Sequence, residues 1–572
     1  MIDPGTILAC VQTCASCIAF IVQTCDTYGA ARAEVVERIA IVENAWTRTR
    51  IQFKFIEPLG PILDAEHHRV LEDVIGILAA KLSSAVRKLE SVLPKQKNGA
   101  DVELRPGWFH FSMGVRRGKY VFLKDSLDEV IQDMEEWQRR FDPSWFLIMR
   151  MANPIIDQQL TMQYQGDSQG PPVSRSPAQR PAPSPPSQQQ HDRHNQSFTL
   201  ATRLQTAPSP LSLADGLRTA LRPDGPHRSV FLPRIDLDFL PIPYCNAKAA
   251  RRISSDRWFL VDRLTCRPTV DVNVMTRDVR ALAQKLTHAD PLTFNLFQCK
   301  GVMRITDPSR PSHILAFDLV FFIPDGMEIP QSLRQTLLLS PVREGVALSI
   351  TRRVRIAQEL ARSVSYVHTF NFVHKNISPE SVLLLEDLET SRSATFLVGF
   401  DRFRSTYGDT VPLGDPDWDR NIYRHPARQG EYPNEAYRMQ HDIYSLGVCL
   451  LEIGLWESFV DYPSDTPVRG GPFRDFPARM MQPTGSGLGS NISRGAVGDE
   501  AKRYMEDLAR TKLLQTMGER YSRVVLSCLT CLDEDNEFFG SDVGQATNDP
   551  GGIRLSVFFN EIVLEPLNEI VV

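Results

Sequence analysis

The sequence predicts two folded domains of different class, an all-α helical bundle followed by an α+β domain with two lobes. Apolar residues recur at helical spacing through most of the first 155 residues. The stretch 165–190 then contains seven Pro, five Ser and six Gln. Such a segment cannot bury enough apolar surface to offset its ordering entropy. Beyond residue 229, short apolar strands alternate with amphipathic helices, which predicts a multidomain chain with a mixed C-terminal fold.

The bundle begins with a run from Pro4 to Cys25 that carries no charged residue. Gln12 and Gln23 make this run too polar for a permanent membrane span, so we expect a helix covered by the rest of the bundle. If the helix were released, its apolar side chains would form a candidate membrane-active surface, namely Ile7, Leu8, Val11, Ile18, Phe20 and Ile21.

Further helices follow the first. A second is expected to end at Pro58, and a long apolar stripe from Leu71 to Leu93 predicts a third. Prolines and glycines in 101–123 predict an interruption, after which we expect a helix over Ser126–Arg140 and another that starts at Asp142.

These patterns predict the domain boundaries. We expect the bundle over 1–155, a flexible linker rich in Pro, Ser and Gln over 156–228, and the α+β domain over 229–572. Within that domain the small lobe covers about 229–325 and the large lobe about 326–572. A segment rich in Gly, Pro and Ser predicts a loop insertion at about 462–498. A short helix is expected inside the linker near Leu211–Leu221.

The most informative stretch starts at His374 and reads H-K-N-I-S-P-E-S-V-L-L. It resembles the protein-kinase catalytic loop H-R-D-L-x-x-x-N. Lys375 occupies the position of the Arg, Asn376 that of the catalytic base and Ser381 that of the metal-binding Asn. A neutral carboxamide cannot take a proton from a hydroxyl group at pH 7.

Three later segments follow in kinase order. Gly399-Phe400-Asp401 stands where kinases carry D-F-G, so Gly399 replaces the metal-binding Asp. Pro426-Ala427 resembles the end of A-P-E without its Glu, and the segment from Asp442 to Gly447 resembles the start of the large central kinase helix. The resemblance implies a kinase-like fold in which Pro426, Asp442 and Gly447 belong to the structural frame.

The small lobe lacks the residues that bind nucleotide phosphates in kinases. No glycine occurs between Gly225 and Gly301, so a Gly-rich loop is absent. No Glu occurs from Phe231 to Met327, and the strand around Trp258 offers only Arg263 where kinases carry a Lys. We therefore expect a pseudokinase that is not an enzyme and holds no metal or cofactor. ATP binding without magnesium stays open.

The N-terminal segment resembles the HeLo-like domains of fungal signalling and cell-death proteins. The resemblance rests on the uncharged first helix and on Phe141-Asp142-Pro143-Ser144-Trp145-Phe146-Leu147. It implies prion-inhibition-and-propagation or heterokaryon-incompatibility biology. The domain order is similar to that of mixed-lineage-kinase-like executioners, in which a pseudokinase restrains a membrane-active bundle.

The leading hypothesis is thus a fungal signalling protein of the programmed-cell-death type, whose dead kinase-like domain regulates the bundle. The alternatives are a divergent active Ser/Thr kinase and a non-catalytic scaffold. We expect signalling-protein partners, self-association through the bundle, conditional membrane contact and a cytoplasmic location with membrane association on activation. A net charge of −5 does not favour nucleic-acid binding. The cysteines of both C-x-x-C pairs are interpreted as buried apolar residues.

Overall fold

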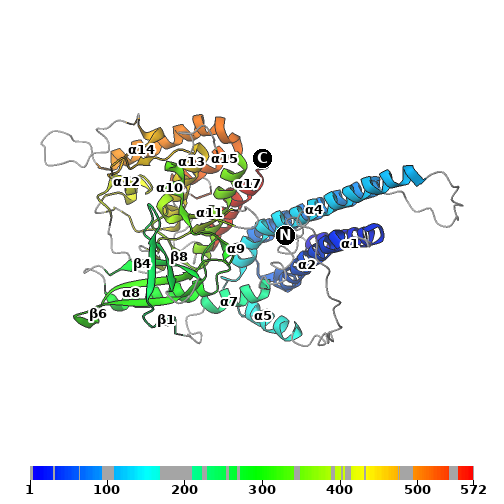
Figure 1. The fold of residues 1–572 in the computed structure, drawn as a ribbon, viewed down its shortest axis with the longest axis horizontal. Coiled ribbons are helices and arrows are strands. Elements are labelled where there is room, and N and C mark those ends of the chain that lie inside the picture. Colours follow the sequence, from blue (N-terminus) through cyan, green and yellow to red (C-terminus); the bar gives the residue numbers. More distant parts are fainter. Residues whose placement is uncertain are drawn as a thin grey trace, which may run out of the picture. The chain divides into compact units, whose positions relative to one another are not determined.

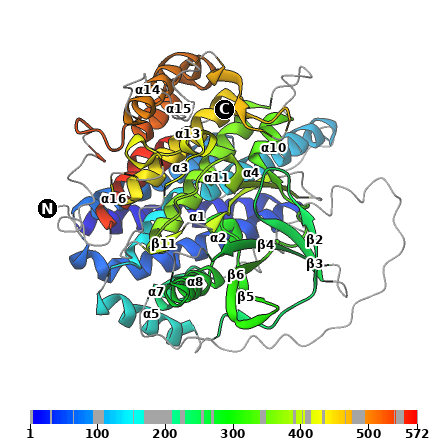
Figure 2. The same cartoon turned by 90° about the vertical axis from the view of Figure 1, so that its left-hand side faces the viewer.

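The chain has an N-terminal helical region and a C-terminal region of mixed α/β structure, as the sequence predicts (Figures 1 and 2). It divides into two compact units, Met1–Asp215 and Gly216–Val572. The computed structural model describes residues 4–29, 33–63, 65–92, 109–151, 153–167, 209–221, 229–252, 257–266, 271–339, 348–387, 393–400, 403–405, 414–430, 433, 435–464, 466–474, 476, 494–536, 538–539 and 552–570.

The N-terminal unit is built of helices α1 (Pro4–Gly29), α2 (Ala33–Ile56), α3 (Ala65–Val92), α4 (Phe109–Ile148) and α5 (Pro154–Asp167). Helix α1 packs most extensively on α3, whose buried Leu71, Leu78 and Leu82 belong to the predicted stripe. None of the helices in the described part of the chain is both long enough and apolar enough to cross a bilayer.

The prediction of two helices around residue 142 is wrong, because α4 continues through Pro143. A proline inside a helix removes a backbone hydrogen bond and costs about 3 kcal/mol. Here the helix buries large aromatic side chains on both sides of the proline, and Trp137 stacks on Phe141 with ring centres 4.7 Å apart. Burial of each such ring contributes about 2–3 kcal/mol, which outweighs the local penalty.

A buried polar network fixes α4 against α2 at the same point. The Asp142 carboxylate accepts hydrogen bonds from Gln52 and Gln138 at 3.2 and 2.5 Å and lies 3.5 Å from Arg48. Since Asp142 precedes Pro143, the network holds the helix where the proline weakens it.

Helix α5 enters the segment that we expected to be linker. Its Ile156 and Leu160 are buried one turn apart, and the helix contacts α2, which explains why it forms. Helix α7 (Pro210–Leu221) covers the short helix expected in that segment. Residues 168–208 lie outside the described residues.

A six-stranded sheet begins the C-terminal unit, with the order β1-β5-β6-β4-β3-β2. Its strands are β1 (Phe231–Leu232), β2 (Leu237–Pro241), β3 (Lys248–Arg252), β4 (Trp258–Thr265), β5 (Cys299–Asp307) and β6 (Arg310–Phe322). Helix α8 (Val272–Thr287) packs on β5 and β6 through Val279, Leu282 and Leu286, followed by α9 (Pro291–Phe294) (Figure 2).

The rest of this unit is mainly helical. Its first helices are α10 (Leu333–Leu338), α11 (Ile350–Thr369), α12 (Trp418–Asn421) and α13 (Met439–Leu455). Helices α14 (Arg494–Leu508), α15 (Leu514–Leu529), α16 (Ile553–Phe559) and α17 (Glu565–Asn568) follow, and β9 (Val382–Glu386) pairs with β10 (Ser393–Leu397) and β7 (Gln331–Ser332). Short pairs join β8 (Phe372–Val373) to β11 (Arg404–Ser405) and β12 (Val460–Asp461) to β13 (Val468–Arg469). Strand β12 ends just before the predicted loop insertion and β13 lies within it, whereas α14 begins before its predicted end at residue 498. Residues 477–493 lie outside the described residues.

Helix α13 is the centre of this helical part, and every one of its residues is buried. It packs closely on α15 because Gly447 has no side chain. A Cβ atom at Gly447 would lie 2.7 Å from the Cβ of Cys528. Both positions are rigid, so neither helix can shift to relieve such a contact without a cost in stability.

We predict that Gly447→Ala lowers the stability of the C-terminal unit by about 1–3 kcal/mol through overpacking. Gly76→Ala in α3 is the control, because its Cβ meets nothing within 4 Å and the helix propensity gain is about 0.5–1 kcal/mol. Calorimetry that resolves the two units measures both changes. A Gly447→Ala protein with an unchanged or higher melting temperature would contradict the close packing of α13 on α15.

Candidate functional site

The residues singled out in the loop at His374 and in the G-F-D segment meet at one site, apart from Asp401, and the carboxylate of Asp442 organises it. Asp442 is fully buried in the first turn of α13. It accepts hydrogen bonds from the backbone N–H groups of His374 and Lys375 at 2.7 and 2.9 Å and from the Tyr437 hydroxyl at 2.7 Å. The ring of His368 lies 3.1 Å away. Burial raises the pKa of Asp442, but the His368 ring, together with His374 and the Tyr437 hydroxyl, outweighs burial and lowers the pKa below its usual value.

His374 packs on Phe400, so the loop contacts the G-F-D segment directly. Their ring centres are 4.8 Å apart, and both side chains are buried. Burial lowers the pKa of His374 to about 4, so the ring is neutral at physiological pH. The contact is therefore an apolar one.

Asn376, Ser381 and Gly399, the three residues that the kinase resemblance places at phosphoryl-transfer positions, are engaged in contacts with one another or with the loop. The Asn376 side-chain amide donates to the Gly399 carbonyl oxygen at 3.3 Å, and the Ser381 hydroxyl donates to the Ser378 carbonyl oxygen at 2.9 Å. Gly399 has a φ of +84°, and a Cβ atom there would lie 3.0 Å from the Cβ of Ser381. An Asp side chain at position 399 would need both the backbone and Ser381 to move.

Asp262 on β4 is a site residue that sequence reasoning missed. Its carboxylate is fully buried and accepts from the backbone N–H groups of Gly399 and Phe400 at 3.0 and 2.9 Å. Arg263, the residue we expected here, is half-exposed and forms a two-point ion pair with Asp318 at 2.7 Å. Successive side chains of a strand point to opposite faces, so only one of the two can reach the loop. In the sequence, the one sign of this role is that Asp262 is an acidic residue inside an apolar strand.

A buried ionic network lies beside the loop and was also missed. Arg334 on α10 is fully buried, with Nε 2.9 Å from Glu380 and Nη1 3.1 Å from Glu452. It also donates to the hydroxyls of Tyr423 and Ser458. Isolated Arg and Glu positions far apart in a sequence give no sign that they will meet.

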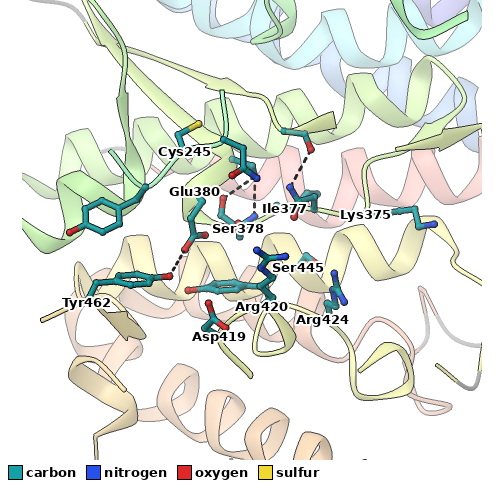
Figure 3. A pocket seen from close by; sticks show the side chains of 16 residues that line it. Cys245, Lys375, Ile377, Ser378, Glu380, Asp419, Arg420, Arg424, Ser445 and Tyr462 are labelled. Carbon is teal, nitrogen blue, oxygen red and sulfur yellow. Dashed lines mark hydrogen bonds between the residues drawn. The ribbon is translucent and has the colours of Figure 1, made fainter. Parts of the chain in front are cut away.

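A pocket of about 370 Å³ opens along the loop (Figure 3). The loop contributes Lys375, Asn376, Ser378 and Glu380, and Arg420 and Arg424 line it from the segment at and after α12. In Figure 3 Glu380 is directed toward Tyr462, and their hydrogen bond measures 3.4 Å. Burial, followed by Asp417 and Glu380, raises the pKa of Asp419 at the pocket wall. The pocket is thus polar and mixed in charge.

The remaining residues predicted from the sequence lie away from this site or outside the described residues. Pro426 is buried at the start of a short 3-10 helix, Pro426–Arg428. Of the α1 residues, Ile18 and Ile21 are buried, and Val11 and Phe20 are half-buried. Ile7 and Leu8 lie within α1. Asp401 lies outside the described residues.

No protein-family model matches this chain, and no curated protein matches it in sequence. Among the described residues, no three His, Cys, Asp or Glu side chains are grouped to hold a metal ion.

The charge state of the Arg334 network depends on pH. Burial raises the pKa of Glu452 to about 7, whereas in Glu380 the nearby Arg334 outweighs burial and lowers the pKa. The folded chain therefore keeps a proton on Glu452 that the unfolded chain releases near pH 4.5. Stability from this proton is present below about pH 4.5 and is lost as pH rises to about 7.

We predict that Glu452→Gln becomes more stabilising as pH rises from 5 to 8, by up to about 3 kcal/mol relative to the parent. The amide keeps the oxygen that accepts from the Phe459 N–H. Glu380→Gln is the matched control and should destabilise at both pH values, because its carboxylate is the ionised partner of Arg334. Urea unfolding at both pH values measures the difference. A Glu452→Gln effect independent of pH would contradict the buried proton.

Proposed function

We propose that the C-terminal unit is a kinase-like domain without phosphotransfer activity, which regulates the helical N-terminal unit. The observation that carries the proposal is Asp262. In kinases the third strand of the small-lobe sheet bears a Lys that pairs with the nucleotide phosphates. Here β4, the third strand of the meander β2-β3-β4, directs a buried carboxylate at the G-F-D segment.

The surrounding arrangement supports a kinase-like fold. The loop at His374 leads into the β9–β10 pair, and β10 leads to Gly399 and Phe400. The loop backbone is held by Asp442 of the central helix. The helix after the third strand, α8, would carry the Glu partner of the kinase Lys, and its sequence contains no Glu.

The electrostatics of the site oppose phosphate binding. The Asp262 carboxylate carries the same sign of charge as a nucleotide phosphate, and two backbone N–H groups already solvate it. Asn376, Ser381 and Gly399 supply neither a base nor a carboxylate for magnesium. Because these parts act as a unit in phosphoryl transfer, their joint replacement favours a binding function over catalysis.

We predict that the purified chain transfers no labelled phosphate from ATP to itself or to generic substrates, with magnesium or manganese. A melting-temperature titration with ATP should likewise give no magnesium-dependent rise. An active kinase assayed in parallel is the positive control. Phosphate incorporation that disappears in Asn376→Ala would instead show a working loop and favour the divergent-kinase alternative.

For the N-terminal unit we propose conditional membrane contact through α1, with self-association and signalling proteins as partners. The apolar side of α1, with Ile18 and Ile21 buried, is covered mainly by α3. Among the described side chains of α1 (residues 9–25), its opposite side exposes Gln12, Ala15 and Gln23 and no charged group. Release of this helix from α3 and α2 would present its apolar side chains to lipid. These features support the proposal of a cytoplasmic signalling role of the cell-death type, with membrane association on activation.

We predict that the fragment 1–215 releases dye from phosphatidylserine-containing vesicles and that Gln12→Glu reduces the release. A charge in α1 opposes insertion by about 2.5–3.5 kcal/mol at the bilayer centre. Gln158→Glu adds the same charge at an exposed position of α5 and should leave the release unchanged. Circular dichroism must show equal helix content. A parent fragment that never releases dye would favour the scaffold alternative.

A further inference from the structure

A second cavity adjoins the pocket that lies along the loop at His374. It has a volume of about 310 Å³ and is lined by Pro416, Asp417, Trp418, Asp419, Arg420 and Pro467. Asp419 and Arg420 line both cavities, so the two form one continuous groove beside α12. Figure 3 shows these two residues at the wall of the first cavity. We call the two joined cavities the α12 groove.

Rings of aromatic residues and prolines form much of the α12 groove. Trp418 and Pro467 are half-buried in the second cavity. Tyr462 is half-buried in the first cavity, and its ring centre lies 5.2 Å from that of Tyr244, which is 40% exposed. Val468, next to Pro467 in the chain, is 38% exposed. A groove lined in this way fits the pyrrolidine rings of an extended proline-rich peptide.

Carboxylates lie beside these rings. Asp417 and Asp419 flank Trp418 in the chain and line the same cavity. In the part of the chain that the structure describes, neither carboxylate forms an ion pair. Burial raises the pKa of Asp419, and the charges of Asp417 and Glu380 act in the same direction, whereas Arg420 opposes them. A cationic side chain in the groove would relieve the repulsion between these carboxylates.

The cations of the groove do not cancel this negative charge. Arg420 and Arg424 also line it, but both pair with Asp415, at 3.3 and 3.5 Å. Lys375 belongs to the first cavity, and in Figure 3 its side chain extends away from Asp419. The charge that remains for a ligand of the second cavity is therefore negative.

A ligand of the α12 groove must bring apolar rings and a positive charge on one side. A polyproline II helix has three residues per turn, so side chains three residues apart lie on the same side. A peptide with the pattern R-x-x-P-x-x-P therefore presents one guanidinium group and two proline rings together. Because such a peptide is already extended when free, it loses little conformational entropy on binding.

We propose that the α12 groove binds a proline-rich segment of a partner protein, in which an arginine precedes two prolines at three-residue spacing. The proline rings pack on Trp418, Pro467 and Tyr462, and the guanidinium group pairs with Asp417 and Asp419. A basic peptide without proline would satisfy the carboxylates but would leave the rings uncovered. The proposal concerns the C-terminal unit alone and depends neither on the absence of phosphotransfer nor on membrane contact by α1.

The test is a fluorescence-anisotropy titration of the full-length chain with the labelled peptide A-Q-R-P-A-P-S-P-P-S-Q. This sequence copies residues 178–188 of the chain itself, which lie outside the described residues. We expect the parent to bind it. Asp417→Asn with Asp419→Asn should weaken binding at least about 10-fold, because a hydrogen bond to a charged group contributes about that factor. Asp236→Asn with Asp535→Asn removes two charges at exposed positions that do not line the groove and should bind as the parent does.

Variant peptides test the two parts of the recognition without changing the protein. Replacement of the peptide arginine by glutamine should weaken binding to the parent, but should have no further effect on the protein with Asp417→Asn and Asp419→Asn. Replacement of the two motif prolines by alanine should weaken binding to both proteins. Equal affinity of the parent for the original peptide and its alanine version would overturn the proposal and assign the groove to basic peptides in general.

The chain's own copy of the pattern, in residues 180–186, is the alternative occupant that the experiment must separate. Arg180→Ala, Pro183→Ala and Pro186→Ala together remove it, and this variant should bind the peptide as the parent does. Binding that appears only in this variant would overturn the proposal and assign the groove to the chain's own segment. Absence of binding by both the parent and this variant would overturn it outright.

Discussion

The structure of the candidate site depends on one buried charge, the carboxylate of Asp442. An unpaired carboxylate in such a place would cost several kcal/mol, so the fold must bring donors to it. Two of those donors are consecutive backbone N–H groups of the loop, at His374 and Lys375. This requirement fixes the path of the loop relative to α13. Lys375 is accordingly held at a φ of +66°, a conformation that few non-glycine residues adopt without such support.

A second carboxylate performs the same task on the other side. Asp262 binds the N–H groups of Gly399 and Phe400, so β4 and the G-F-D segment are joined through one acidic side chain. In an active kinase the corresponding strand directs a cation at the nucleotide. Under the kinase-like fold proposed above, this chain carries a carboxylate satisfied by its own backbone where an active kinase directs a cation at an external anion. The carboxylate ties β4 to the G-F-D segment, so this position contributes to rigidity.

The sequence predicted the elements whose evidence is local. Helical spacing located α3, and the motif order located the loop and the start of α13. The sequence did not predict the features that depend on packing between residues far apart in the chain. Pro143 suggested a helix boundary, yet burial of Trp137 and Phe141 keeps α4 continuous there. The interruption expected over 101–123 is also wrong for its second half, because α4 begins at Phe109 and includes Gly114 and Gly118. At the site, Asn376, Ser381 and Gly399 were found by position in a motif, whereas Asp262 and Arg334 are defined only by partners far away in the chain.

The position of Gly399 limits which substitutions the site accepts. An aspartate introduced there would crowd Ser381, and an aspartate introduced at 376 would set a carboxylate against the Gly399 carbonyl oxygen. Each substitution therefore lowers stability on its own. For the kinase-like domain proposed above, this means that single substitutions cannot build up a set of phosphoryl-transfer residues without a loss of stability at each step.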